Sequence, residues 1–353
     1  MRVLVTGGAG YIGSTVVSAL LDAGHEPVVL DDLSTGRVEL VPEVPFHRGD
    51  VADTALVRRV LARHRDLTTV VHCAARVVVP ESVTDPAAYY RTNVAGTLDL
   101  AATLADCGVT DLVFSSSASI YAAGDGSGLD EDTPLAPASP YARTKATAEM
   151  VLADLAAATG LRALFLRYFN PVGADPLLRT GQQHAAATHV LARLIQAHRA
   201  GRPFRLTGTT HPTPDGTAIR DFVHVWDLAR AHVAAVERFD RALAGRPANA
   251  INLGTGSGTS VRELVRTFEA VVGQPVDVVE APPRPGDTVG GFARCERAHH
   301  LLGWTSALSV ADGIRDALAW DERRDEVLGH RRPGPGRQAA ARPPGTPRRA
   351  VHR

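Results

Sequence analysis

Short apolar runs alternate with longer segments of mixed apolar and polar positions through the first half of the chain. The short runs have the length of buried strands, and the longer segments have the length and spacing of amphipathic helices. Strands are predicted over five runs: Val3–Thr6, Val28–Leu30, Thr69–His72, Leu112–Ser115 and Leu164–Arg167. Helices are predicted over residues 11–23, 86–107 and 141–158. This order is typical of a parallel sheet with helices on both faces. The sequence therefore predicts an α/β fold built on a doubly wound, Rossmann-type sheet.

Three parts of the chain differ in pattern. Residues 1–169 carry the regular alternation and are predicted to form the sheet domain. Over residues 170–330, Pro- and Gly-rich connections separate isolated elements, which predicts a smaller mixed α/β domain. Residues 331–353 contain arginine, proline, glycine and alanine but no acidic residue, so they are predicted to form a disordered basic tail.

A glycine-rich segment follows the first predicted strand. Residues 6–13 read Thr-Gly-Gly-Ala-Gly-Tyr-Ile-Gly and open the first predicted helix. Glycine at Gly7, Gly10 and Gly13 permits a tight turn, close backbone approach to a pyrophosphate and close helix packing, at a helix end that attracts anions. Asp31 ends the second strand about twenty residues further on, where an acid accepts ribose hydroxyls and repels the 2′-phosphate of NADP. The segment therefore predicts an NAD site.

One lysine occurs among the 38 basic residues of the chain, and it is Lys145. A guanidinium is a wide planar fork and an ammonium is a compact point charge, so a position that keeps lysine indicates a need for that shape. Ser139 and Pro140 are typical of the cap and first residue of a helix, which places Tyr141 in the opening turn. Residues four apart share a helix face. The pair predicts a phenol and an ammonium in one cleft, the alternative being two ordinary surface residues.

Composition narrows the partners and the compartment. The formal net charge is zero and the pI is about 7.3, which argues against a nucleic-acid partner for the folded part. Cys73, Cys107 and Cys295 lie far apart without metal-ligand spacing, so neither a disulfide framework nor a metal site is predicted. No apolar run approaches the roughly 20 residues of a membrane span, and a strand directly after Met1 does not fit a signal peptide. We expect a cytoplasmic protein.

Ten sequence blocks, in their order along the chain, resemble those of the extended short-chain dehydrogenase/reductase family and, within it, the UDP-glucose 4-epimerases. The likeness covers roughly residues 1–325. Its blocks are Gly7–Gly13, Pro80–Val83, Asn93–Thr97, Ser115–Ala118, Tyr141–Lys145, Arg167–Ala174, Asp215–Thr217, Arg220–Val225, Asn252–Gly256 and Pro285–Asp287. The resemblance implies an NAD-binding domain over residues 1–169 and a sugar-nucleotide-binding domain over residues 170–330.

The resemblance implies a transient oxidation at C4 of a UDP-hexose. Tyr141 matches the base that takes the proton of the 4-hydroxyl, while NAD accepts a hydride and returns it to the other face of the 4-keto sugar. Lys145 and the nicotinamide charge are expected to stabilise the phenolate, whose pKa must fall by roughly 3 units from about 10. Ser117 matches a hydroxyl that bonds the reacting oxygen. The expected activity is the interconversion of UDP-glucose and UDP-galactose, a step of galactose metabolism.

The resemblance also implies which residues bind each ligand. Cofactor-binding residues are expected to be Gly7, Gly10, Tyr11, Ile12, Gly13, Asp31, Asp32, Asp50, Val51, Ala74, Asn93, Tyr141, Lys145 and Tyr168. Substrate-binding residues are expected to be Ser117, Asn170, His189, Arg220, Arg284, Asp287 and Gly291. Arg220 and Arg284 would hold the diphosphate, for which bidentate guanidinium groups are suited, and Asp287 would hold the uridine ribose.

Three positions depart from the family pattern. Val77 occupies the place of a lysine that contacts cofactor and substrate phosphate, with Arg76 beside it as a replacement. His189 replaces an asparagine and is expected to donate a hydrogen bond to a uracil carbonyl. Gly291 replaces a tyrosine that narrows the sugar pocket. We expect the missing phenol to open space for N-acetylated UDP-hexoses.

Other activities of the same fold stay open on sequence grounds. An epimerase of UDP-glucuronate or of UDP-pentoses can differ from the expected one by a single pocket residue. A non-catalytic NAD-binding sensor would keep the glycine-rich segment but would not depend on Tyr141. A 4,6-dehydratase is disfavoured, because it needs an Asp-Glu pair where this chain has Ala118–Ile120.

The predicted helices 86–107 and 141–158 both carry stripes of Ala, Leu and Val. In the family these two helices pair across a two-fold axis, so the resemblance implies a homodimer. The stripes alone are equally compatible with packing onto the sheet.

Overall fold

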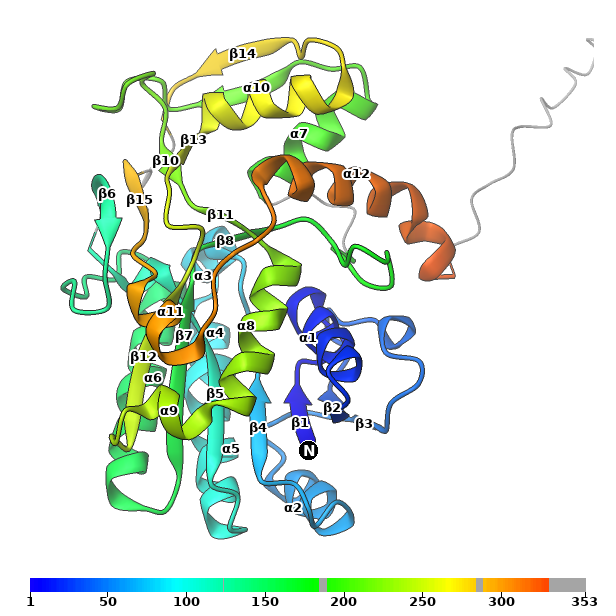
Figure 1. Cartoon of the computed structure of the whole chain (residues 1–353), viewed down its shortest axis with the longest axis vertical. Coiled ribbons are helices and arrows are strands. Elements are labelled where there is room, and N and C mark those ends of the chain that lie inside the picture. Colours follow the sequence, from blue (N-terminus) through cyan, green and yellow to red (C-terminus); the bar gives the residue numbers. More distant parts are fainter. Residues whose placement is uncertain (123, 184–188, 284–287, 330–353) are drawn as a thin grey trace, which may run out of the picture.

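A seven-stranded parallel sheet forms the centre of the computed structural model, which describes residues 1–122, 124–183, 189–283 and 288–329. Its strand order is β12-β7-β5-β4-β1-β2-β3 (Figure 1). The strands are β1 (Arg2–Thr6), β2 (Glu26–Asp31), β3 (Phe46–Arg48), β4 (Thr69–His72), β5 (Asp111–Ser117), β7 (Arg162–Tyr168) and β12 (Ala248–Leu253). The chain order of the strands reverses between β1 and β4. In open parallel sheets, ligands bind outside the carboxyl ends of the strands at this switch point.

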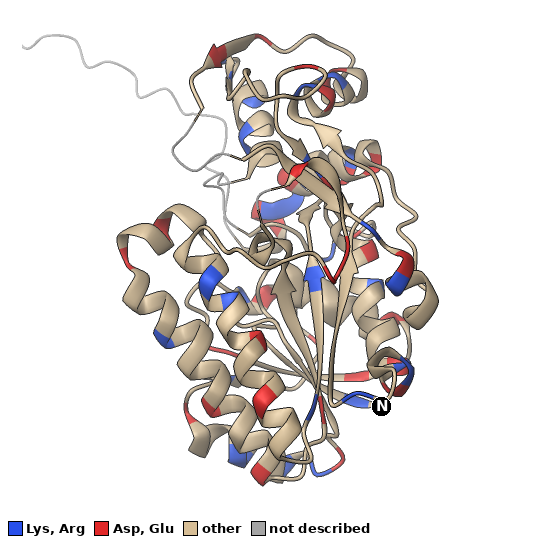
Figure 2. Cartoon of the chain, turned by 90° about the vertical axis from the view of Figure 1, so that its left-hand side faces the viewer, with Lys and Arg blue, Asp and Glu red and all other residues tan. Residues whose placement is uncertain are grey.

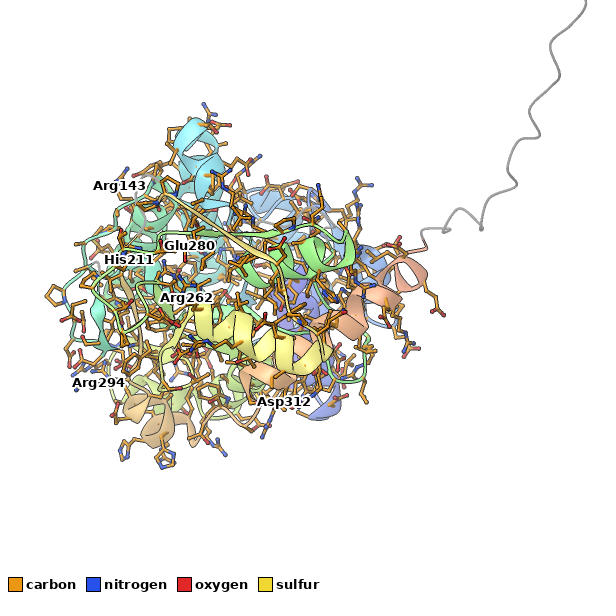
Figure 3. All side chains as sticks on the ribbon, turned by 90° about the horizontal axis from the view of Figure 1, so that it is seen from above. Arg143, His211, Arg262, Glu280, Arg294 and Asp312 are labelled. Carbon is orange, nitrogen blue, oxygen red and sulfur yellow. The ribbon has the colours of Figure 1, made fainter. Side chains whose placement is uncertain are left out.

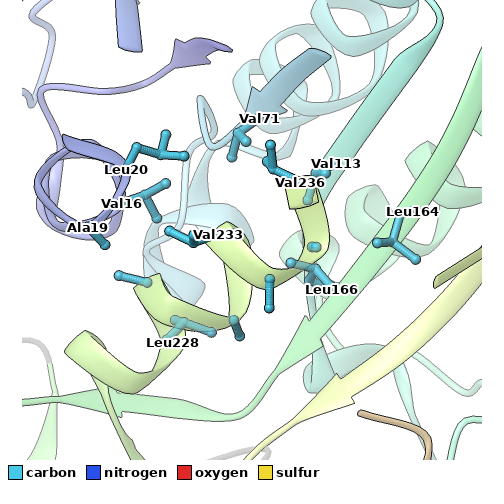
Figure 4. Packing of buried hydrophobic residues seen from close by; sticks show 14 of the residues in the cluster. Val16, Ala19, Leu20, Val71, Val113, Leu164, Leu166, Leu228, Val233 and Val236 are labelled. Carbon is cyan, nitrogen blue, oxygen red and sulfur yellow. The ribbon is translucent and has the colours of Figure 1, made fainter. Parts of the chain in front are cut away.

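Helices cover both faces of the sheet. One face carries α1 (Tyr11–Asp22), α8 (Val225–Glu237), α9 (Phe239–Leu243) and α11 (Glu296–Leu302). The other carries α2 (Thr54–Arg63), α5 (Gly96–Asp106) and α6 (Pro140–Ala158). Successive strand residues point to opposite faces. In β4, Val71 therefore joins the core beneath α1 and α8, whereas Val70 joins the core beneath α2 and α5. Figure 4 shows the first of these cores, where Val16 and Leu20 of α1 lie beside Val233 of α8.

The predicted Rossmann-type sheet is confirmed, and all five predicted strands are present. The predicted helix 86–107 forms from α4 (Pro86–Tyr90), a π-helical turn (η2, Arg91–Ala95) and α5. A short helix, α3 (Val79–Thr84), precedes them. Gly24, which follows α1, has a φ of 78°, a left-handed conformation that glycine adopts without strain.

A second layer of elements lies beyond the carboxyl ends of the large sheet (Figure 1). Its core is built from α7 (Val190–Arg199), α10 (Val261–Val272) and α12 (Val310–Val327), packed with β9 (Phe204–Thr207) and its parallel partner β14 (Val278–Ala281). Figure 3, a view from above, labels Arg262 at the start of α10 and Glu280 in β14, which form an ion pair between these two elements.

Two small sheets join this layer to the large one. A four-stranded sheet has the order β13 (Thr259–Ser260), β10 (Ile219–Arg220), β15 (Gly290–Ala293) and β6 (Asp125–Leu129). A two-stranded sheet pairs β8 (Asn170–Val172) with β11 (Phe222–His224). Strand β6 comes from the first half of the chain and pairs with β15 from the second half. These sheets therefore bring the two halves together above the switch point.

The chain returns to the large sheet after the predicted boundary at residue 169. Strand β12 pairs with β7 from Ala248 with Ala163 to Leu253 with Tyr168, and α8 packs against α1. This pairing gives β7 a hydrogen-bonded neighbour on its second side, so β12 instead of β7 forms that edge of the sheet. Residues 1–169 thus hold six of the seven strands of the sheet, and later residues complete it.

In the view of Figure 2, acidic and basic residues are interspersed along the described helices, strands and loops. This distribution agrees with the equal numbers of acidic and basic residues in the chain. None of the helices that the structure describes is both long enough and apolar enough to cross a membrane.

Candidate active site

The glycine-rich turn after β1 lies at the switch point. A Cβ on Gly7 would lie 2.6 Å from the backbone nitrogen of Ala74, and a Cβ on Gly13 would lie 2.1 Å from the carbonyl oxygen of Gly7. Both distances exclude a side chain, so the turn after β1 and the segment after β4 meet backbone to backbone. Gly10 caps α1 without a side chain, which leaves the helix amides open to an anion. This cradle fits the pyrophosphate of a dinucleotide.

Asp31, at the end of β2, is buried and holds this turn. Its Oδ2 accepts a hydrogen bond from the Ala9 amide at 3.0 Å, and its Oδ1 accepts one from the Leu33 amide at 2.8 Å. Burial raises the pKa of Asp31, and the two amide hydrogen bonds oppose that rise. Each carboxylate oxygen has a second acceptor position, so binding to a ribose is compatible with these contacts. The neighbouring Asp32 is exposed and accepts from the Ser34 amide at 2.8 Å.

Asn93 joins the segment after β4 to helix α6. It lies in the π-helical turn, a feature that is frequent at functional sites. Its Oδ1 accepts from the Arg76 amide at 2.8 Å, and its Nδ2 donates to the Arg76 carbonyl and to Thr144 Oγ1, both at 3.0 Å. The Asn93 amide group is thus engaged by protein groups. It ties the backbone of Arg76, two residues after Ala74, to Thr144 of α6.

The remaining predicted cofactor residues near the turn differ in surroundings. Asp50 is exposed and accepts from the amide two residues further on at 2.9 Å, whereas Val51 is buried. Ile12 packs against the core beneath α1. The Tyr11 phenol donates to the carbonyl of Gly173 at 2.7 Å. The side chain of Tyr11 therefore ties the glycine-rich helix to the chain that follows β8.

Ser117, Tyr141 and Lys145 all lie at the carboxyl edge of the sheet. Ser117 is the last residue of β5, and the other two lie one turn apart in α6. Their exposed fractions are 9%, 9% and 3%. Ser139 caps α6 as predicted, because its hydroxyl accepts from the amide three residues on at 3.1 Å. The two chemically important side chains of α6 therefore face the protein interior.

The Lys145 ammonium is closely enclosed. Its Nζ donates to the Ser115 carbonyl at 2.8 Å and lies 4.7 Å from the centre of the Phe114 ring. Burial lowers the pKa of Lys145 to about 8, although Cys73 and Glu149 act in the opposite direction. An arginine would bring a planar fork into a space that holds a point charge. This enclosure gives a physical reason for the one lysine in an arginine-rich chain.

Burial raises the pKa of the Tyr141 phenol, and a hydrogen bond with Ser117 opposes the rise. The Lys145 ammonium donates to the Ser115 carbonyl. Stabilisation of the phenolate by Lys145 together with the positive charge of the oxidised nicotinamide ring stays a prediction.

A buried polar cluster lies next to Lys145. Ser115 Oγ is 3.1 Å from Cys73 Sγ and 3.4 Å from His232 Nε2. His232 Nδ1 donates to the Leu228 carbonyl at 2.9 Å, and burial lowers the pKa of His232 to about 4, so this imidazole is neutral at pH 7. Its ring centre lies 6.2 Å from that of Tyr168, whose pKa burial raises strongly. The predicted cofactor residue Tyr168 thus borders the same cluster.

The predicted sugar-nucleotide residues come from the second layer. Asn170 is partly buried in β8, and its backbone amide donates to the Asp221 carbonyl at 2.9 Å. Arg220 lies in β10, and its Nη1 donates to the Ile219 carbonyl at 2.7 Å. His189 is exposed at the start of α7. Two further predicted residues, Arg284 and Asp287, lie outside the described residues.

Gly291 lies in β15 and faces strand β6. A Cβ on Gly291 would lie 2.7 Å from the Ser127 carbonyl oxygen and 3.3 Å from Leu129 Cδ1. The backbone of β6 therefore occupies the place that the first side-chain atom of residue 291 would need, where free space for an N-acetyl group was expected. A side chain at this position requires β6 to shift.

Arg76 and Val77 lie at the rim of the site. Arg76 Nη1 is 2.9 Å from Glu81 Oε1, and both side chains are about half exposed. Val77 is 54% exposed. The guanidinium of Arg76 thus takes part in a surface ion pair. Among these contacts, neither Arg76 nor Val77 directly replaces the lysine that the family has at this place.

Glu149 is a buried residue of the site that no sequence motif predicted. It follows Lys145 by four residues on the same face of α6, and it is 4% exposed. The signal that could have found it is a carboxylate at helical spacing from Tyr141 and Lys145 among Ala and Leu residues. Its partner, Arg167, was noted only as part of a family block.

Comparison with known proteins gives consistent results. The sequence profile of the NAD-dependent epimerase/dehydratase family matches residues 3–254. A UDP-glucose 4-epimerase of Azospirillum brasilense is 46% identical over 331 residues, which cover 93% of this chain and 94% of that protein. The structure of a UDP-glucose 4-epimerase from Brucella ovis in complex with NAD is 40% identical, with a TM-score of 0.85, and the match covers 90% of this chain and 97% of that one.

A second solved structure shows the same similarity. It is a UDP-glucose 4-epimerase from Stenotrophomonas maltophila with bound NAD and formylated UDP-arabinopyranose, 35% identical with a TM-score of 0.87, and the match covers 92% of this chain and 99% of that one. These matches extend over nearly the whole folded chain, and the glycine cradle and the buried Tyr141–Lys145 pair agree with them. The chain therefore belongs to the NAD-dependent epimerase/dehydratase family.

Proposed function

We propose that this enzyme interconverts UDP-glucose and UDP-galactose with NAD as its cofactor. The observation that carries the proposal is the buried Tyr141–Lys145 pair beside Ser117, at the edge of the sheet where the glycine-rich turn forms a dinucleotide cradle. The relatives named above, which are UDP-glucose 4-epimerases, support the same activity.

The glycine-rich turn and Asp31 would hold NAD, which would supply a hydride acceptor for C4 of the sugar and a hydride donor to its opposite face. Tyr141 takes the proton of the sugar 4-hydroxyl and returns it when the hydroxyl is restored. The hydrogen bond between Ser117 and Tyr141 places a second hydroxyl beside the phenol, where it can pass the proton and orient the sugar oxygen. Lys145 supplies the positive charge of the protein next to this pair. Its bond to the Ser115 carbonyl keeps that charge in place.

Burial of the three groups also serves the chemistry. Water that reached the site would compete for the proton and would weaken each electrostatic contact. The low exposure of Ser117, Tyr141 and Lys145 therefore favours proton transfer to the sugar over exchange with solvent.

The uridine diphosphate is proposed to bind along the second layer. Arg220 is proposed to contact the diphosphate, together with Arg284, and Asp287 the ribose. Asn170 and His189 are proposed to contact the sugar and the uracil, respectively. The place of Arg220 supports this, because β10 and β15 face the carboxyl edge of the large sheet from which Ser117 comes.

Acceptance of N-acetylated UDP-hexoses is a finer part of the proposal. It rests on the absence of a side chain at Gly291, and the close approach of Ser127 limits how much room that absence provides. Turnover of UDP-N-acetylglucosamine supplied at millimolar concentration tests it. No turnover under these conditions would refute this part and leave the main activity untouched.

A homodimer is proposed through α5 and α6. Their outward faces expose Leu98 at 40% and Met150 at 59%, and Tyr90 at the end of α4 is 40% exposed. Analytical ultracentrifugation of the enzyme and of a Met150→Asp variant tests this surface. A monomeric wild type, or a variant that dimerises as the wild type does, would contradict it.

A cytoplasmic location stays a prediction, supported by three cysteines that are all unpaired.

The experiment that tests the activity is incubation of the purified enzyme with NAD and a panel of UDP-sugars, followed by chromatographic separation of the 4-epimers. We expect UDP-galactose and UDP-glucose to interconvert. Conversion of UDP-glucuronate or a UDP-pentose in preference to UDP-glucose would assign the enzyme to another substrate of the same chemistry. Absence of conversion with every sugar would leave a non-catalytic NAD-binding protein.

A further inference from the structure

Helix α6 presents three chemically active side chains on one buried face. Tyr141, Lys145 and Glu149 follow one another at intervals of four residues, and residues at this spacing share a face. Their exposed fractions are 9%, 3% and 4%. A carboxylate is rarely so deeply buried unless it is paired. Glu149 is therefore expected to have a charged partner. Its place one helical turn from Lys145 also needs a physical explanation.

The Glu149 carboxylate has partners from two strands. The Ser116 hydroxyl, in β5, donates a hydrogen bond to Glu149 Oε1. Arg167, in β7, donates from Nε to Oε1 at 3.0 Å and from Nη2 to Oε2 at 2.6 Å. The Arg167 and Glu149 side chains are 9% and 5% exposed. This two-pronged geometry fixes the carboxylate in both position and orientation.

Arg167 is itself held on its far side. Its Nη1 donates to the Tyr121 hydroxyl at 3.1 Å and to the Glu131 carbonyl at 3.2 Å. The Tyr121 hydroxyl in turn donates to Asn252 Oδ1 at 2.6 Å. The guanidinium thus lies in a network that reaches β12, and it has little freedom to leave Glu149.

The groups around Lys145 differ in charge at neutral pH. His72 and Cys73, at the end of β4, face the ammonium, as do the Phe114 ring and Ser115 carbonyl of β5 and the carboxylate of Glu149 on its own helix. Burial lowers the pKa of His72 to about 3 and raises that of Cys73 to about 11. Both are therefore neutral at pH 7.

We propose that Glu149 is a positioning residue for the catalytic lysine. Its carboxylate, clamped by Ser116 and Arg167, fixes helix α6 against β5 and β7, so that Lys145, one turn away on the same helix face, is held with its ammonium at the Ser115 carbonyl. This inference rests on the proposed function, because Lys145 belongs to that catalytic site. It adds that the pair Glu149–Arg167 sets the electrostatics of the site without touching the substrate.

The single lysine of the chain makes a direct test possible. Protein labelled with ¹⁵N-lysine gives one side-chain Nζ signal, and its titration is followed by NMR in the full-length enzyme with NAD. Glu149→Gln removes the carboxylate and leaves the Arg167 cation, so we expect the titration midpoint of Lys145 to fall by about one pH unit. The double variant Glu149→Gln, Arg167→Met removes both charges, and its midpoint is expected to return toward that of the wild type.

A matched control is available in the exposed pair Arg162–Asp240, where the Asp240 side chain is 84% exposed. Asp240→Asn likewise removes the carboxylate that pairs with an arginine, and it is expected to leave the titration midpoint of Lys145 unchanged. In turnover, Glu149→Gln is expected to lower kcat about tenfold with an unchanged KM, the pattern of a lost transition-state interaction. If Glu149 had a merely structural role, this pattern would not appear: the titration midpoint of Lys145 would not fall in the single variant and then return in the double variant.

A Glu149→Gln protein with the wild-type midpoint would overturn the proposal. If that variant does not fold, Glu149→Asp keeps the charge and withdraws it by one methylene; it is expected to lower kcat, and an unchanged kcat would equally overturn the proposal. The NMR titration needs no sugar substrate. An enzyme that converts no UDP-sugar would refute the proposed function while the titration still decides the role of Glu149.

Discussion

The catalytic edge of the large sheet and the four-stranded sheet above it are built in different ways. At the catalytic edge, the seven-residue strands β5 and β7 and the 19-residue helix α6 present buried side chains that contact one another directly. In the four-stranded sheet, β10 and β13 have two residues each, and glycines let neighbouring backbones touch, as at Gly291. Arg220 there donates to the carbonyl of Ile219 in its own strand and to that of Thr288, which precedes β15.

Under the proposed function, this difference separates chemistry from recognition. Long, buried elements hold Tyr141, Lys145 and Ser117 in one geometry, as proton transfer requires. Short strands and connections carry the groups proposed to recognise the sugar nucleotide, and such regions tolerate sequence change better than a packed core does. Substitutions at the catalytic edge are therefore expected to act on kcat, and substitutions in the four-stranded sheet on the choice of substrate.

The largest effect is expected from Tyr141→Phe. It removes the hydroxyl proposed to exchange the proton and keeps the buried ring, so turnover is expected to fall at least about 100-fold while NAD stays bound. A UDP-galactose conversion assay and the cofactor content of the purified variant measure the two effects. Near-normal turnover would show that the catalytic edge does not carry the chemistry.

Lys145→Arg is expected to have the next largest effect. It keeps the positive charge and changes its shape in a space bounded by the Phe114 ring and the Ser115 carbonyl. We expect kcat to fall about tenfold to 100-fold through misplacement of the charge. Steady-state kinetics at saturating UDP-galactose measure it. Wild-type kcat in this variant would mean that charge alone suffices and that the enclosure has no catalytic importance.

The buried histidines of the large-sheet region predict how its stability depends on pH. The pKa of His232 is lowered to about 4 in the folded protein from an ordinary value of 6.5, so the unfolded chain binds more protons between these values. The free energy of unfolding is therefore expected to fall as the pH drops below about 6.5. The lowered pKa of His232 accounts for about 2 kcal/mol of this decrease between pH 6.5 and pH 5.

Urea unfolding at these two pH values tests this, with His232→Gln compared with His300→Gln, which replaces an exposed histidine. The pH dependence is expected to weaken in the first variant and not in the second. An equal dependence in both would show that His232 is not held neutral.

The smallest effect is expected from Gly291→Ala in the four-stranded sheet. The new Cβ meets the Ser127 carbonyl at 2.7 Å, so β6 must shift, and the ratio of kcat/KM between N-acetylated and plain UDP-hexoses is expected to change about fivefold. Gly160→Ala adds the same group where no atom lies within 4 Å and serves as the control. A loss of kcat for all substrates alike would place Gly291 with the catalytic edge instead.

Much of the fold followed from local pattern. The strand runs, the capped start of α6 and the glycine at 24 depend on residues that are neighbours in the chain. Periodicity, caps and turns are read over a few residues, and their physical causes act over the same range. The spacing of Tyr141 and Lys145 is local in the same sense, which is why the sequence alone pointed to a shared cleft.

The sequence by itself thus determined the sheet, the glycine-rich turn and the one retained lysine. Only the tertiary structure decided which partners these groups meet: Asp31 with the amide of Ala9, Lys145 with the Ser115 carbonyl, and Glu149 with Arg167. It also decided that β12 completes the large sheet and that β6 lies against Gly291. These pairings join residues that are far apart in the chain, and burial shifts the pKa of Asp31 and of Lys145. No short window of the sequence therefore contains the physical cause of these contacts.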